Sequence, residues 1–179
     1  MLKTLRQIAS IGIATEPAPR ADDSLRVREG LQERIRAVLG RALCIRQVDA
    51  GSCNGCELEI QALNNPLYNI EGLGIRFVAS PRHADLLLVT GPVTLNMREA
   101  LERTYAAVPA PKWVVAVGDC GAGCGVFANS YACVGAVSKV IPVDLVIRGC
   151  PPTPTQLLQG LLWLVGGAEQ RATASARTS

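Results

Sequence analysis

The sequence is poor in aromatic residues, has one histidine, and has no long apolar run. Aromatic residues make up 4% of the 179 positions. Base-stacking platforms for single-stranded nucleic acid are therefore not expected, and we predict no nucleic-acid partner. The longest apolar stretch, from Leu157 to Val165, is far shorter than the roughly 18 residues that a membrane-spanning helix requires. We expect a chain that does not cross a bilayer by itself but can sit on a membrane assembly.

Cysteine, by contrast, is abundant. The chain has seven cysteines, at positions 44, 53, 56, 120, 124, 133 and 150. An odd number in a chain of this length, without a secretory signal pattern, argues against a disulfide framework. In a reducing compartment, clustered cysteines more often bind metal or carry out redox chemistry, so the cysteines are the first candidates for function.

The basic charge is concentrated at the N-terminus, where residues 1–47 hold nine Lys or Arg against five acidic residues. Apolar positions with helical spacing predict a short amphipathic helix over 1–13 and a second helix over 24–39, which Gly40 ends. We therefore expect a basic helical N-terminal extension over residues 1–42. Contact with a membrane arm is one role for it, and a partner-binding or disordered arm is the alternative.

Short apolar strands then alternate with helices. The pattern predicts strands at 43–48, 75–79, 85–90, 113–117 and 145–147, and helices at 57–64, 97–107 and 153–165. Nearly continuous apolar strands separated by helices are typical of an α/β fold, a doubly wound parallel sheet with helices on both faces. We expect this domain to span residues 43–167 and to be followed by a flexible tail over 168–179.

Four cysteines follow strands directly. Cys53 and Cys56 come after the first predicted strand, Cys120 after the fourth and Cys150 after the fifth. Ligands of such sheets bind beyond the carboxyl ends of the strands, so the fold should bring these thiols to one edge. Glycines beside each thiol allow tight turns and let backbone N–H groups point at an anionic site.

This pattern favours a four-thiolate metal or cluster site, and two other interpretations stay open. The C-x-x-C pair alone could be a thioredoxin-like dithiol, and zinc also accepts four thiolates. Cys44 and Cys133 are expected to pack as small apolar residues, with Cys133 in a turn or helix. Cys124 shares a loop with Cys120 and is a less favoured substitute for it.

Several separated runs resemble one known family. They are Gly-Ser-Cys-Asn-Gly-Cys-Glu-Leu-Glu-Ile at 51–60, Ser-Pro-Arg-His-Ala-Asp at 80–85, Val-Ile-Pro-Val-Asp at 140–144 and Gly-Cys-Pro-Pro-Thr-Pro at 149–154. Together they resemble the small subunit of energy-converting (group 4) nickel–iron hydrogenases of the formate hydrogenlyase type. They are also similar to the homologous 20 kDa subunit of respiratory complex I. The resemblance covers about residues 43–166.

The resemblance implies a flavodoxin-like fold and one 4Fe–4S cluster held by Cys53, Cys56, Cys120 and Cys150. It further implies an electron-transfer subunit that is not catalytic alone. Its partners would be a hydrogenase-type or complex I-type large subunit, a ferredoxin-like iron–sulfur subunit and membrane-arm subunits. It would lie peripherally on the cytoplasmic side of the inner membrane. The C-x-x-C spacing, where complex I subunits have adjacent cysteines, favours the hydrogenase branch over a quinone-reducing complex.

Five further polar residues are candidates for supporting roles. Glu57 and Glu59 could relay a proton to the reduced site, although acids in the first turn of a helix are also ordinary. The resemblance implies that Glu59 is buried near the large-subunit interface and that Arg82 lies close enough to tune the cluster. His83 is a relay candidate on the same loop, and Asp85 is expected to order that loop.

Overall fold

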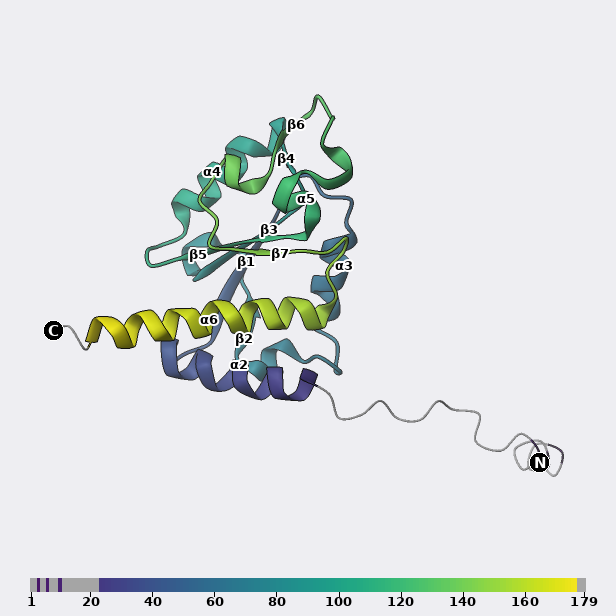
Figure 1. Ribbon diagram of the computed structural model, residues 1–179, viewed down its shortest axis with the longest axis vertical. Helices are drawn as coiled ribbons and strands as arrows, with labels where there is room; N and C mark the ends of the chain where they lie inside the picture. Colours follow the sequence, from purple (N-terminus) through teal and green to yellow (C-terminus); the bar gives the residue numbers. More distant parts are fainter. Residues whose placement is uncertain (1–2, 4–5, 7–9, 11–22, 177–179) are drawn as a thin grey trace.

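A five-stranded parallel sheet forms the centre of the protein (Figure 1). The computed structural model describes residues 3, 6, 10 and 23–176. The strand order is β2-β1-β3-β5-β7, and every adjacent pair in this sheet is parallel. The strands are β1 (Leu43–Asp49), β2 (Ile75–Phe77), β3 (Leu86–Thr90), β5 (Trp113–Val117) and β7 (Leu145–Ile147). This order is that of a flavodoxin-like fold, as expected.

Helices cover both faces of the sheet. Figure 1 shows α2 and α6 running side by side on one face, with α4 and α5 on the other. The helices are α2 (Asp23–Leu39), α3 (Gly55–Ala62), α4 (Leu95–Ala107), α5 (Gly118–Gly123) and α6 (Pro154–Ala176). Gly40 adopts φ 63° directly after α2, which explains why the helix ends there. None of the described helices is both long enough and apolar enough to span a membrane.

The central strand β3 shows why the sheet is so apolar. All five of its residues are buried. Leu86 and Leu88 face the core beneath α2 and α6, whereas Leu87 and Val89 face the core beneath α4. A strand that is covered on both faces must be apolar at consecutive positions, which accounts for the Leu-Leu-Leu-Val run.

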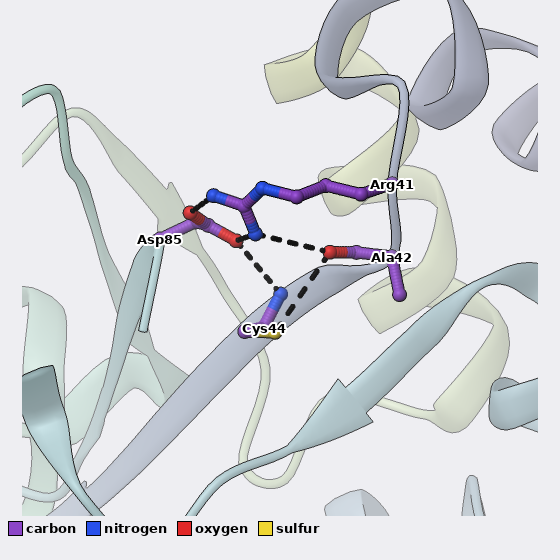
Figure 2. Close-up of polar contacts among 4 residues, drawn as sticks. All are labelled: Arg41, Ala42, Cys44 and Asp85. Carbon is purple, nitrogen blue, oxygen red and sulfur yellow. Dashed lines mark hydrogen bonds and ion pairs between the residues drawn. The ribbon is translucent and has the colours of Figure 1, made fainter. Parts of the chain in front are cut away.

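Asp85, directly before β3, forms hydrogen bonds with Arg41 and with the backbone of Cys44 in β1 (Figure 2). Its Oδ2 accepts hydrogen bonds from the backbone N–H of Cys44 at 3.0 Å and from Nη1 of Arg41 at 2.8 Å. The second guanidinium nitrogen of Arg41 pairs with Oδ1 of the same carboxylate. Asp85 therefore orders this region, as expected, by holding the start of β1 beside the start of β3.

Some predicted elements differ from the structure. Helix α3 begins at Gly55 rather than residue 57, because Asn54 turns the chain in the left-handed region at φ 71°. Helix α6 continues to Ala176, into the segment expected to be a flexible tail. Cys133 lies in strand β6 (Cys133–Gly135), not in a turn or helix; this strand pairs with β4 (Val93–Thr94) in a small antiparallel sheet that the sequence did not predict.

The N-terminal extension is only partly described. The predicted amphipathic helix over 1–13 lies largely outside the described residues. Helix α2 shares the core of the sheet, since Leu31 and Ile35 are buried in it. The division of the chain at residues 42 and 167 remains a prediction.

Candidate metal centre

Four thiols meet at the carboxyl edge of the sheet. Cys53 and Cys56 follow β1, Cys120 lies in α5 after β5, and Cys150 follows β7. All four line one cavity of about 90 Å³. Two side chains, Cys53 and Cys150, are exposed, whereas Cys120 is buried. The fold thus brings together residues that are up to 97 positions apart in sequence, as their strand-end placement predicted.

The loop that carries Cys53 is shaped by the last residue of β1. Oδ1 of Asp49 accepts the backbone N–H of Gly51 at 2.8 Å and of Ser52 at 2.7 Å. The hydroxyl of Ser52 then accepts the N–H of Asn54 at 3.0 Å. These bonds turn the chain away from the strand and start α3, so that Cys56 lies in the first turn of that helix.

A second set of bonds ties Cys120 to Cys150 through their neighbours. The N–H of Asp119 donates to the carbonyl oxygen of Gly149 at 2.9 Å. Oδ1 of Asp119 accepts the N–H of Gly149 in return, at 3.2 Å. This reciprocal pair joins the start of α5 to the loop after β7. Asp119 was not among the residues predicted to take part in the site; its place between Gly118 and Cys120 at a strand end was the available signal.

Three glycines lie where a larger side chain would collide with a thiol or with the nearby backbone. A Cβ on Gly118 would lie 2.7 Å from Sγ of Cys56, and one on Gly125 would lie 2.9 Å from Sγ of Cys120. Both glycines have positive φ angles, 83° and 47°. A Cβ on Gly91 would strike the backbone of Ser52 at 2.5 Å. These positions need glycine because the backbone approaches closely there.

The surroundings of two of the four thiols oppose thiolate formation. Burial raises the pKa of Cys56 to about 12, and the negative charges of Glu57, Cys53, Cys120 and Cys150 add to the effect. Burial also raises the pKa of Cys120. Metal ligation requires the thiolate form, so a bound metal group would have to supply the positive charge that offsets this cost. Four thiols around one cavity are a donor set that such a group accepts.

The remaining cysteines do not line the cavity. Cys124 is buried at the C-terminal end of α5, where its N–H donates to the carbonyl oxygen of Cys120 at 2.8 Å. Cys44 is buried in β1 and Cys133 is half-buried in β6. The structure thus places Cys120 rather than Cys124 beside the other three thiols.

The two acidic residues after Cys56 differ in burial. Glu57 is 5% exposed, and among the described residues neither of its carboxylate oxygens has a hydrogen-bond partner. Glu59 is only half-buried within this chain. Burial of Glu59 near a large-subunit interface remains a prediction, whereas Glu57 is already buried within this chain.

Arg82 and His83 do not line the cavity of the four thiols. Both are exposed in a short 3₁₀ turn, η2 (Pro81–His83), which precedes β3. Cluster tuning by Arg82 and proton relay by His83 remain predictions.

No three His, Cys, Asp or Glu side chains among the described residues are grouped closely enough to hold a single metal ion. Four thiolates around one zinc ion would have to converge at about 2.3 Å from it. Cysteine thiolates are also the usual ligands of iron–sulfur clusters, in which each thiolate binds a different iron. The four thiols line one cavity.

Comparison with known proteins identifies relatives in respiratory and hydrogenase complexes. Formate hydrogenlyase subunit 7 of Escherichia coli is 45% identical over 134 residues, which are 75% of this chain and 52% of that protein. A probable membrane-bound hydrogenase subunit of Pyrococcus furiosus is 43% identical over 138 residues, 75% of this chain and 83% of that one. The chain thus spans about half the length of the first relative and most of the second.

Two further comparisons agree. A subunit of the NADH-quinone oxidoreductase of Heliobacterium modesticaldum is 44% identical over 110 residues, covering 61% of this chain and 63% of that protein. A chain in the structure of an archaeal membrane-bound sulfane sulfur reductase superposes with a TM-score of 0.65 at 34% identity, covering 79% of this chain and 77% of that one. Residues 53–164, which include all four cavity thiols, match the family described as NADH ubiquinone oxidoreductase, 20 Kd subunit. The chain belongs to this family, whose members are subunits of oxidoreductase complexes.

Proposed function

We propose that Cys53, Cys56, Cys120 and Cys150 hold one 4Fe–4S cluster. The observation that supports this most strongly is that the four thiols, and no other cysteine, line a single cavity whose walls include close-packed glycines. Four cysteine thiolates are the usual ligands of such a cluster. When bound, the cluster would supply one-electron redox chemistry, and the chain would supply the ligands, the shielding and the orientation.

The chain then serves as the electron-transfer subunit of a membrane-bound nickel–iron hydrogenase complex. Its relatives in formate hydrogenlyase and in a probable membrane-bound hydrogenase support this role, as does the C-x-x-C spacing of the first cysteine pair. Electrons would pass between a ferredoxin-like iron–sulfur subunit and the catalytic large subunit. The chain would lie peripherally on the cytoplasmic side of the membrane, held by membrane-arm subunits, with no catalytic step of its own.

Two exposed apolar side chains close to the thiols suit a face that a partner covers. Leu58 is 58% exposed in α3, two residues after Cys56, and Val126 is 82% exposed in the 3₁₀ helix η3 (Gly125–Phe127), two residues after Cys124. Burial of such side chains against the large subunit would exclude water from the exposed thiols Cys53 and Cys150.

Of the three relay candidates, Glu57 is the best placed. Its carboxylate is buried next to Cys56 and has no hydrogen-bond partner among the described residues, which leaves a polar group buried beside a thiol of the cavity. Glu59 and His83 lack this combination of burial and proximity. The proposal is tested by the pH profile of hydrogen turnover in a Glu57→Gln complex, with Glu59→Gln as the control.

The alternative is a component of a quinone-reducing complex, which the NADH-quinone oxidoreductase relative supports. The companion large subunit decides between the two. Two C-x-x-C pairs in that subunit, as needed for nickel and iron, mark a hydrogenase, and their absence marks a quinone-type enzyme. A zinc-stabilised module without redox chemistry is the remaining alternative. A visible absorption band that dithionite bleaches would support the cluster, whereas a colourless chain with one zinc ion would overturn it.

A further inference from the structure

Strand β1 has an open edge beyond the end of β2. On one side β1 pairs with β3 over residues 45–49. On the other side it pairs with β2 only over residues 43–45, because β2 ends at Phe77. Within the described part of the chain, the carboxyl half of β1, directly before the loop that carries Cys53, therefore has no strand beside it on this side.

The backbone groups on this edge can be identified from the register. The carbonyl oxygen of Ile45 accepts the N–H of Val78 at 2.9 Å, so Ile45 directs its backbone groups toward β2. Alternate residues of a strand direct these groups the same way, which places those of Gln47 and Asp49 on the open edge. Among the described residues, the backbone N–H and C=O of these two residues have no backbone hydrogen-bond partner on that edge. They form an unpaired row of donors and acceptors.

A groove of about 450 Å³ follows this edge. Its lining residues are Arg46, Gln47, Asp49, Phe77, Val78 and Ala79. The Nε of Arg46 is buried and has no hydrogen-bond partner among the described residues. Phe77 is half-buried and offers an apolar wall, while the Asp49 carboxylate already accepts the N–H groups of Gly51 and Ser52 through Oδ1.

We propose that an extended segment of a partner protein docks in this groove by strand addition to β1. The segment would donate and accept backbone hydrogen bonds at Gln47 and Asp49, as edge-binding peptides do. Successive side chains of a strand point to opposite faces, so the segment would place an acidic side chain at Arg46 and an apolar one against Phe77. The proposal rests on membership of a multisubunit complex, but not on the identity of the group that the thiols hold.

Hydrogen–deuterium exchange tests the proposal with controls inside the same strand. The full chain alone is compared with the complex purified with its companion subunits, at single-amide resolution. The amides of Gln47 and Asp49 should exchange rapidly in the free chain and at least about tenfold more slowly in the complex. The amides of Arg46 and Val48, which face β3, should be protected in both samples. Equal exchange at Gln47 and Asp49 in both samples, or protection already in the free chain, would overturn the proposal.

A charge reversal at Arg46 tests whether the docked segment carries an acidic side chain there. Arg46→Glu should abolish the added protection at Gln47 and Asp49 in the complex. Arg76→Glu is the matched control, because Arg76 is exposed on β2 and lies outside the groove lining. Loss of protection in both variants, or in neither, would contradict an acidic partner residue at Arg46. Iron and sulfide analysis of the same samples keeps this test separate from the cluster proposal, since unprotected amides with a full cluster would overturn only the docking site.

Discussion

Replacing Gly118 by alanine tests the packing around Cys56. The new Cβ would lie 2.7 Å from Sγ of Cys56, whereas ordinary van der Waals contact begins at 3.4 Å. The thiol would have to move by about 0.7 Å, which exceeds the roughly 0.2 Å tolerance of metal–ligand distances. Alanine at φ 83° also carries a backbone cost of about 1–2 kcal/mol. We expect a folded chain of lower stability that holds less iron.

Gly123→Ala is the matched control within the same helix. A Cβ on Gly123 meets no atom within 4 Å, and this residue has no positive φ angle. The two variants are compared by iron and sulfide content per chain and by urea unfolding of the metal-free protein. Gly118→Ala should lose most of its iron and about 1–2 kcal/mol of stability, while Gly123→Ala should match the parent chain in both. Equal iron content in the two variants would refute the idea that Gly118 makes room for the Cys56 ligand.

Three more predictions follow from particular contacts. In the metal-free chain the thiol of Cys56, with its pKa raised to about 12, should stay protonated in the folded state above pH 9 while the unfolded chain ionises. Stability should therefore fall as the pH rises from about 9 toward 12; urea unfolding measures this, and Cys56→Ala should flatten the slope. Asp85→Asn should cost about 1–3 kcal/mol in thermal or urea unfolding, because it weakens the pairing with Arg41 and the bond from Cys44. Glu99→Gln, which breaks only the exposed pair with Arg103, should cost about 0.5 kcal/mol or less, and an equal loss in both would be inconsistent with a special role for Asp85. Glu57→Gln should unfold at higher urea concentration than the parent chain, because it removes a buried unpaired carboxylate; a lower midpoint would show that the carboxylate has a partner.

The sequence predicted the parallel sheet and the closeness of the four thiols, because both depend on where the apolar strands end. Buried parallel strands such as β3 are apolar at consecutive positions, and the residues after them necessarily gather at one edge. Placing Cys53, Cys120 and Cys150 after strands therefore predicted that they lie close together. The glycines beside these cysteines also indicated tight turns at the strand ends, where an anionic site could form.

Features that depend on tertiary packing were harder to predict. The family resemblance implied that Arg82 lies close to the cluster, whereas the structure shows only that Arg82 is exposed in η2 and outside the lining of the thiol cavity. The burial of Glu57 depends on how α3 packs against its neighbours, which the sequence pattern does not specify. The reciprocal bonds of Asp119 with Gly149 join segments 30 positions apart, and the place of Asp119 at a strand end did not indicate which residue it would bond. Functional geometry here depends on contacts between loops that the strand pattern does not specify.

The most direct test of the central claim is the iron, sulfide and zinc content of the anaerobically purified chain, followed by electron paramagnetic resonance of its cysteine variants. We predict about four iron and four sulfide ions per chain and a signal that Cys150→Ala and Cys120→Ala abolish or convert. Cys133→Ala and Cys124→Ala should leave that signal unchanged. A chain that contains one zinc ion and no sulfide would contradict the cluster. A signal that survives Cys120→Ala but is lost in Cys133→Ala would contradict the ligand assignment.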